Sequence, residues 1–363
     1  MAFCELIDFE LLIKQIPGSL PAGIDPRLDI SPTSQYYRLK DIRGHARAHE
    51  RAMLAEADDF HGVEIEWRPL AEQLPQILTD EVKDLEYAAW LIEALCRTDG
   101  FAGLASGFKL ARLLIEHFWS CLYPSIDEDG PETRIAPLIG LNGFEGDGAL
   151  ITPILSISLT ENTSLGQFAC WQYERAAEIS RKDEKRQKLK ADAGVASLDQ
   201  IKDAVAETPA DFYQSLLIHI ENAISEFSLL SQAMDVAMAG QPQPTSAISK
   251  ALIKCRDAVH YLAADKLKST QAFDIANAQT TSATEAPFTS VQHQIQSREQ
   301  VLLTLKQSAE FFRRTEPHSP ISYALEQVVH WSSLTLPELL QEMIDDNNSR
   351  NHFFRLAGIP QLK

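Results

Sequence analysis

Two histidines with metal-ligand spacing stand at His45 and His49. Residues four apart on an α-helix point to the same side, so the two imidazoles could reach one Zn²⁺. A zinc peptidase helix would carry glutamate directly after the first histidine, and alanine stands there instead. Arg43, Arg47 and Arg51 share the segment and would repel a dication. We favour a solvated helix face, and keep a helical metal-dependent enzyme using His45, His49 and a carboxylate as the alternative.

Three glycines, Gly100, Gly103 and Gly107, could suggest a phosphate-binding loop. Their spacing is neither GxGxxG nor GxxxxGK[ST], and no strand pattern precedes them. Ser106 lies in GLASG rather than GxSxG, so a nucleophile elbow is not indicated either. The pattern is typical of a corner between two helices, where glycine permits a positive φ and close helix packing.

Carboxylates gather in a turn at Asp127, Glu128 and Asp129. A calcium loop needs alternating ligands and a late bidentate glutamate, and Gly130-Pro131 interrupts that register. We interpret the segment as a solvated acidic turn.

Two further histidines, His318 and His330, have Glu316 and Glu326 near them in the sequence. Acid–base catalysis would require a geometry that the sequence does not define. Histidines near helix ends are usually structural, and we predict no catalytic residue and no cofactor here.

The strongest helical pattern runs from Asp84 to Pro124. Apolar residues recur at intervals of three and four in DLEYAAWLIEALCR, which puts them on one helix face. A glycine-rich corner, TDGFAG, leads to a second helix, LASGFKLARLLIEHFWSCLY, which we expect Pro124 to stop. This hairpin is a packing module, and we expect it to support a docking surface rather than to form that surface.

The remaining pattern predicts an all-α fold, because period-two alternation is scarce. Segment 17–34 reads as a loop, and the mainly basic run 181–190 as a domain junction or an exposed helix. We expect helices at about 3–16, 35–57, 67–78, two within 131–160 on either side of NGFEGDG, one from about 212 to 238, one at 246–264, and further helices in 291–363.

The domain prediction follows from the change in composition along the chain. Residues 1–160 form a multi-helix N-terminal domain and 161–267 a helical middle region. Residues 268–290 are rich in Thr, Ser and Ala, which predicts a flexible linker. Residues 291–363 regain helical periodicity and form a small C-terminal domain.

The C-terminal segment is dense in large apolar side chains. They could be the core of a small helical domain, or part of them could pack against other copies, because about 70 residues bury little surface alone. We predict oligomer contacts at Phe311, Phe312, Tyr323, Trp331, Leu336, Leu339, Phe353 and Phe354.

Bulk charge restricts the partners. The 363-residue chain has a net charge of −18, which argues against nucleic acid and anionic membrane surfaces. No run approaches the ~18 apolar residues of a membrane span, and the acidic start does not resemble a signal peptide. The five cysteines form no CxxC pair and suggest small buried hydrophobes. We expect a cytoplasmic protein.

Several sequence motifs, in their order along the chain, resemble those of the TssA family of the bacterial type VI secretion system, whose N-terminal region is called the ImpA-type domain. They are PAGIDPRLD, YYRLKDIRGHARAHER, EWRPLAEQLPQIL and the hairpin with its Tyr123-Pro124 ending. Later words are TPADFYQSLL, CRDAVHYLA, SREQVLLTLKQSAEFFRRTEPHSPISYALEQVVHW, LPELLQEMI and LAGIP. Together they cover most of the chain, and their order is more specific than any single word.

The resemblance implies a non-enzymatic assembly component. Such proteins act in the cytoplasm at the inner-membrane apparatus, with baseplate, membrane-complex, tail-tube and sheath proteins as partners. It also implies a ring-shaped homo-oligomer built by the C-terminal region, with N-terminal domains on flexible linkers. A generic helical adaptor unrelated to secretion is the further alternative.

Overall fold

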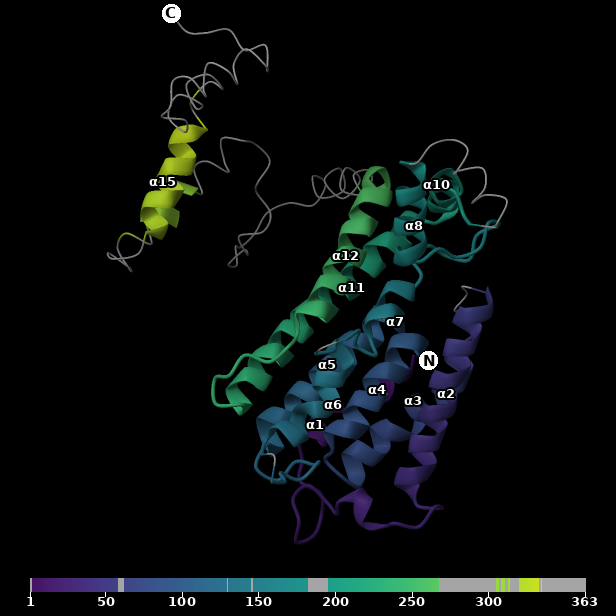
Figure 1. The fold of residues 1–363 in the computed structure, drawn as a ribbon, viewed down its shortest axis with the longest axis vertical. Helices are drawn as coiled ribbons and strands as arrows, with labels where there is room; N and C mark the ends of the chain where they lie inside the picture. The colour runs from purple at the N-terminus through teal and green to yellow at the C-terminus, as the bar shows by residue number, and fades with distance from the viewer. Residues whose placement is uncertain are drawn as a thin grey trace, which may run out of the picture. The chain divides into compact units, whose positions relative to one another are not determined.

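The computed structural model describes residues 2–57, 62–128, 130–144, 146–181, 195–267, 305–306, 308–310, 313, 320–332 and 334. The chain divides into two compact units, Met1–Thr281 and Ser282–Lys363. Across the described residues the regular structure is helical, and β-pairing is limited to isolated bridges (Figure 1). The all-α prediction is therefore confirmed.

The first unit opens with short elements before its long helices. Residue Asp8 divides the expected helix at 3–16, because its carboxylate accepts the backbone N–H groups of Glu10 and Leu11 and so starts a new helix. The elements are η1 (Phe3–Leu6), α1 (Phe9–Leu12), η2 (Pro26–Leu28), α2 (Gln35–Ala57) and α3 (Glu64–Asp80).

The predicted hairpin consists of α4 (Leu85–Thr98) and α5 (Gly100–Phe118), with Asp99 between them. Helix α5 begins at the first glycine of the corner, four residues earlier than expected. It also ends at Phe118, so the prediction that Pro124 stops it is wrong. The chain turns away sooner because the Tyr123 N–H bonds the Lys83 carbonyl and the Tyr123 carbonyl accepts the Leu85 N–H.

The glycines let the two helices of the hairpin approach closely. Gly100 has a φ of +57°, and a Cβ on Gly103 would lie 2.3 Å from the Leu95 carbonyl oxygen. A Cβ on Gly107 would lie 2.8 Å from the Ile92 Cγ1 atom. The helix-corner interpretation is confirmed, since larger residues would force α4 and α5 apart.

The rest of the first unit is also helical. The pair at 131–160 appears as α6 (Glu132–Asn142) and α7 (Ile151–Ser156), as predicted. Two short helices, α8 (Cys170–Ser180) and α10 (Leu198–Glu207), were not expected from the sequence. The long predicted helices are α11 (Ala210–Ala237) and α12 (Ser246–Leu262).

The core of the first unit extends across residue 160. Helix α11 packs along α5, with the rings of Phe108 and Phe227 4.8 Å apart. The main cluster of buried side chains contains residues from Ile7 to Ala263, and a second, smaller cluster consists of Phe168, Ala176, Ile201 and Ala204. The main cluster thus includes side chains from both sides of residue 160.

In the second unit, the structure describes helix α15 (Ile321–Trp331) and a few residues before and after it. The predicted linker 268–290 lies outside the described residues, as does 182–190 of the basic run. None of the described helices is long and apolar enough to cross a membrane.

Candidate functional site

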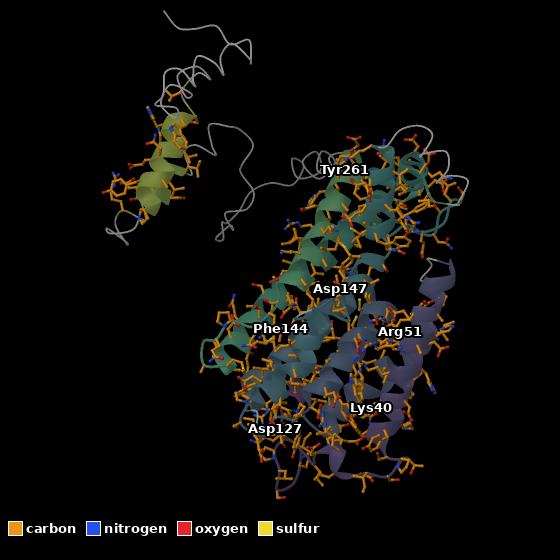
Figure 2. All side chains as sticks on the ribbon, viewed as in Figure 1. Lys40, Arg51, Asp127, Phe144, Asp147 and Tyr261 are labelled. Carbon is orange, nitrogen blue, oxygen red and sulfur yellow. The ribbon has the colours of Figure 1, made fainter. Side chains whose placement is uncertain are left out.

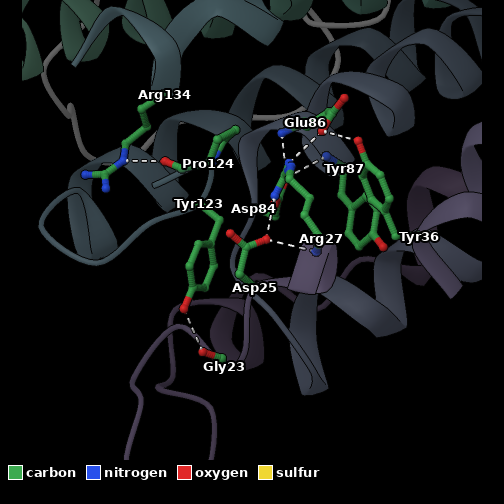
Figure 3. Close-up of polar contacts among 10 residues, drawn as sticks. All are labelled: Gly23, Asp25, Arg27, Tyr36, Asp84, Glu86, Tyr87, Tyr123, Pro124 and Arg134. Atoms are coloured by element: carbon green, nitrogen blue, oxygen red, sulfur yellow. Dashed lines mark hydrogen bonds and ion pairs between the residues drawn. The ribbon is translucent and has the colours of Figure 1, made fainter. Parts of the chain in front are cut away.

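A charged clamp joins the loop before α2 to the start of α4 (Figure 3). The guanidinium of Arg27 donates from Nη1 to Asp84 Oδ2 at 2.7 Å and from Nη2 to Glu86 Oε2 at 2.6 Å. The hydroxyl of Tyr36 donates to the same Glu86 oxygen at 3.1 Å, and its ring lies 5.2 Å from the Arg27 guanidinium carbon. One cation thus connects three elements, namely η2, α2 and α4.

The loop is shaped to deliver Arg27 to this position. Gly23 has a φ of +79°, and a Cβ there would lie 2.0 Å from the Glu81 carbonyl oxygen, so glycine is required. Asp25 begins η2 by accepting the Arg27 N–H at 3.0 Å, and it also accepts from Nη1 at 3.0 Å. The hydroxyl of Tyr123 donates to the Gly23 carbonyl at 3.1 Å.

The Asp84 carboxylate is fully buried and serves two purposes. Its Oδ1 accepts the N–H groups of Glu86 and Tyr87 at 2.7 and 3.0 Å, which caps α4. Burial raises the pKa of Asp84, while Arg27 and the backbone N–H groups oppose that shift. Burial lowers the pKa of Arg27, but Asp84 and Glu86 outweigh it and raise that pKa overall. The contact with Arg27 and the two capping N–H groups partly offset the cost of burying the Asp84 carboxylate.

Lys83 is a buried cation next to the clamp. Its ammonium donates to the carbonyls of Leu78 and Thr79 at 2.9 and 3.0 Å, at the end of α3, and lies 5.4 Å from the Phe118 ring centroid. Burial lowers the pKa of Lys83 to about 8. It therefore joins α3 to α5 at the cost of desolvating an amine.

Arg134 fixes the second loop at this end of the unit. Its guanidinium donates to the carbonyl oxygens of Pro124 and Trp119, and it lies 5.4 Å from the Trp119 ring centroid. The Tyr123–Pro124 peptide bond is cis. The Tyr123-Pro124 end of the hairpin motif therefore lies in a loop after α5, and Arg134 of α6 holds that loop in place.

Further ion pairs join α2 to α4 along the helices. The buried Glu93 carboxylate accepts from Arg43 Nε at 2.5 Å, and Arg47 Nε lies 4.0 Å from its other oxygen. Next to it, Arg97 donates from Nε and Nη2 to the two oxygens of Glu50, each at 3.0 Å. Buried charges are tolerated only when paired in this way, so these contacts fix the position of α2.

A groove of about 660 Å³ runs beside the clamp, between α2, α4 and α6. Arg43 and Arg47 line the α2 side, and Trp90 and Leu141 provide apolar surface. Asp147 contributes from the loop after α6, in which Phe144 is exposed (Figure 2). Most charged side chains that line the groove already form ion pairs within the chain. Such a lining suits a protein-binding surface better than a reaction centre.

The sequence-predicted metal and turn residues are not among the residues of the clamp. His45 and His49 are exposed on α2, as a solvated helix face requires. Among the described residues, no group of three or more His, Cys, Asp or Glu could hold a metal ion. Asp127 accepts the Thr133 hydroxyl at 2.6 Å in the exposed turn, and Asp129 lies outside the described residues.

The cysteines match their interpretation in part. All five are free. Three are buried, and burial raises the pKa of the Cys96 thiol to about 12. Cys4 and Cys121 are only partly buried.

Two of the predicted oligomer residues are described. Tyr323 is 65% exposed on α15, and Trp331 is half-buried at its end. His330 is exposed, and Glu326 accepts from Arg313 at 2.5 Å. The predicted oligomer residues Phe311, Phe312, Leu336, Leu339, Phe353 and Phe354 lie outside the described residues, as do His318 and Glu316.

The clamp itself was missed at the sequence level. PAGIDPRLD and the start of the hairpin were recognised as separate sequence motifs. Arg27 and Asp84 are 57 residues apart, and that spacing does not indicate that they are in contact. One signal was available, because Asp84 directly precedes the first apolar-periodic residue, where a helix N-cap is expected.

Comparisons with known proteins agree with this architecture. Residues 13–143 match the family model "ImpA, N-terminal, type VI secretion system". The type VI secretion system component TssA1 of Pseudomonas aeruginosa is 26% identical over 354 residues, covering 95% of this chain and 97% of that protein. A solved N-terminal domain of the TssA component from Burkholderia cenocepacia, which includes the ImpA_N region, superposes with a TM-score of 0.58 at 22% identity. That match covers 72% of this chain and 95% of the solved domain.

Proposed function

Because this chain belongs to the TssA family of type VI secretion components, we propose that it is a non-enzymatic scaffold for assembly of the secretion apparatus. In this proposal it works in the cytoplasm at the inner membrane, where it coordinates the baseplate, the membrane complex, and the tail tube and sheath. The observation that supports it most strongly is the similarity to TssA1 along nearly the full length of both chains.

The charged clamp is consistent with a scaffold. Its cation and carboxylates bind one another, and together they hold a loop on the hairpin. Catalysis instead requires groups that remain available to a substrate. The clamp therefore supports a role in which the first unit keeps a fixed surface for other proteins.

We further propose that residues 291–363 assemble copies of the chain into a ring. Tyr323 and Val328 are exposed apolar residues on α15, as an interface between copies would need. A ring would present many N-terminal units together, and weak contacts at high effective concentration give strong overall binding.

The test of the ring is the mass of the full chain in solution by multi-angle light scattering. A defined oligomer is expected, and a chain truncated after residue 281 should be monomeric. The Trp331→Ala variant should shift the full chain toward smaller species without loss of helicity. A monomeric full chain would eliminate the ring, and an oligomer that survives truncation would place its contacts in the first unit.

A further inference from the structure

A row of cations on α2 borders the groove between α2, α4 and α6, which we call the α2 groove. The row is Lys40, Arg43, Arg47 and Arg51, and its spacing of three and four residues places the four side chains on one side of the helix. Arg43 and Arg47 line the groove, and Lys40 and Arg51 are exposed farther along α2 in either direction (Figure 2).

The two arginines that line the groove have hydrogen-bonding capacity left over. Arg43 donates to Glu93 through Nε, and among the described residues its two terminal nitrogens have no hydrogen-bond partner. Arg47 is half-buried, and its Nε lies 4.0 Å from the Glu93 Oε1 atom, beyond hydrogen-bond reach. That Oε1 atom is itself buried and has no hydrogen-bond partner within the part of the chain that the structure describes.

The charges nearest Arg47 are mainly positive. Burial lowers the pKa of Arg47, and neighbouring arginines lower it further, while the Glu93 carboxylate acts in the opposite direction. These neighbours are Arg43, Arg51 and Arg97. Arg97 is matched by Glu50, so three arginines remain against the single Glu93 carboxylate.

The other carboxylates of the groove do not remove this surplus. Asp147 lines the wall that follows α6, and with it the α2 end of the groove still has three cations and two anions. At the start of α4, the clamp sets Arg27, with Lys40 nearby, against three carboxylates. They are Asp25, Asp84 and Glu86. Glu86 and Glu93 are about 10 Å apart along the helix axis, so the groove is negative at the clamp and positive at Glu93.

We propose that the α2 groove binds a segment of a partner protein through one aspartate or glutamate side chain, whose carboxylate pairs with Arg43 and Arg47. A guanidinium group binds a carboxylate through two parallel N–H···O bonds, and the terminal nitrogens of both arginines are available for them. Trp90, Pro137 and Leu141 offer apolar surface to the neighbouring side chains of the segment. The proposal rests on the assembly function, since it takes the partner to be a protein of the same apparatus.

The charge distribution disfavours three other occupants. A phosphate group carries about 1.5 to 2 negative charges, which exceeds the surplus of one and would be repelled by Asp147. A basic segment would meet Arg47 and its neighbours. A second copy related by two-fold symmetry would bring the same row of cations against itself. A single carboxylate therefore matches the groove best.

The test measures binding of the full chain to purified baseplate, tube and sheath proteins of the same apparatus by biolayer interferometry. We expect one of them to bind. Its Kd should rise about tenfold or more for Arg47→Gln, which removes the surplus charge but keeps a long polar side chain. Arg47→Lys should restore only part of the affinity, because an ammonium group cannot make the two parallel bonds. Raising NaCl from about 0.05 M to about 0.5 M should weaken binding several-fold.

A second variant, Gly140→Leu, narrows the groove without changing its charges. Gly140 lines the α6 wall, and a Cβ there would have no atom within 4 Å, so the helix can accept a side chain that projects into the groove. Its Kd should also rise about tenfold or more.

Arg38→Gln is the matched control, because it makes the same change of charge at an exposed position of α2 that does not line the groove. It should bind like the wild type. Circular dichroism should show unchanged helicity for all the variants, so that a loss of binding does not reflect unfolding.

The outcomes separate this inference from the assembly function. If a component binds the wild type and Arg47→Gln equally, the carboxylate site is wrong and the assembly function stands, even if Gly140→Leu binds less tightly. If no component binds the wild type, both fail. Inorganic phosphate, or a second copy of the chain, bound by the wild type and lost in Arg47→Gln would overturn the choice of an acidic partner segment.

Discussion

Replacing Asp84 with asparagine tests whether the charged clamp holds the first unit together. The change keeps the side-chain oxygen that caps α4 and removes the charge that faces Arg27. Removing one partner of a buried ion pair costs about 3–5 kcal/mol, because the other charge is left uncompensated. Arg27 is a quarter exposed and keeps Glu86 at 2.6 Å, so we expect the lower end, about 3 kcal/mol.

A double-mutant cycle isolates the pair from other effects. Arg27→Met alone should cost about 3 kcal/mol, since it leaves Asp84 buried with only backbone donors. The double variant should lose at least about 1.5 kcal/mol less than the sum of the two single losses, because neither buried charge remains. Asp257→Asn, at an exposed position on α12, is the control and should cost below about 0.5 kcal/mol.

The assay is urea unfolding at pH 7, followed by tryptophan emission. Trp67 and Trp90 are buried in the first unit and report on its core. The free energy of unfolding follows from the midpoint and slope of each curve. A loss below about 1 kcal/mol for Asp84→Asn, or additive single losses in the cycle, would refute the view that the clamp anchors the loop.

Three further predictions concern the hairpin, the buried lysine and the histidines. In the same urea assay, Gly103→Ala should lower the free energy of unfolding by about 1–3 kcal/mol, because its Cβ would clash with the Leu95 carbonyl. Gly44→Ala, on α2, should raise it by up to about 1 kcal/mol, because a Cβ there has no atom within 4 Å and alanine favours the helix. The folded-state pKa of Lys83, about 8, lies below its ordinary 10.5, so the unfolded chain binds more protons between these values and stability should rise with pH there. Relative to Lys83→Met, the wild-type gain across that window should approach about 3 kcal/mol, and parallel pH profiles would contradict it. Elemental analysis of the purified protein should find no stoichiometric metal, and a full equivalent lost in His45→Ala would revive the metal-enzyme alternative.

The hairpin and long helices could be predicted from the sequence because their apolar spacing is local. Helix α2 was predicted with its observed bounds, and α11 nearly so. The end of α5 was not, because backbone pairing of Tyr123 with Lys83 and Leu85 competes with further helical turns. Helices α8 and α10 are short, and their apolar pattern is correspondingly brief.

The candidate site was less accessible to sequence reasoning than the fold. Arg27, Tyr36 and Asp84 lie far apart in the chain, and their contact depends on how the loop returns across the hairpin. The exposure of Ile24, Leu28 and Ile30 was equally hidden, since predicting a loop at 17–34 does not say which of its side chains face solvent. Local periodicity specifies helices, whereas a surface depends on which side of a loop is anchored.

The assembly function is tested most directly by counting sheaths in cells that carry a fluorescent sheath protein. Cells that lack this chain should assemble few or no sheaths, and the full chain should restore them. A chain truncated after residue 281 should fail to do so, because it lacks the segment proposed to form the ring. Normal sheath numbers without the chain would contradict the assembly function, and full rescue by the truncated chain would contradict the role given to residues 291–363.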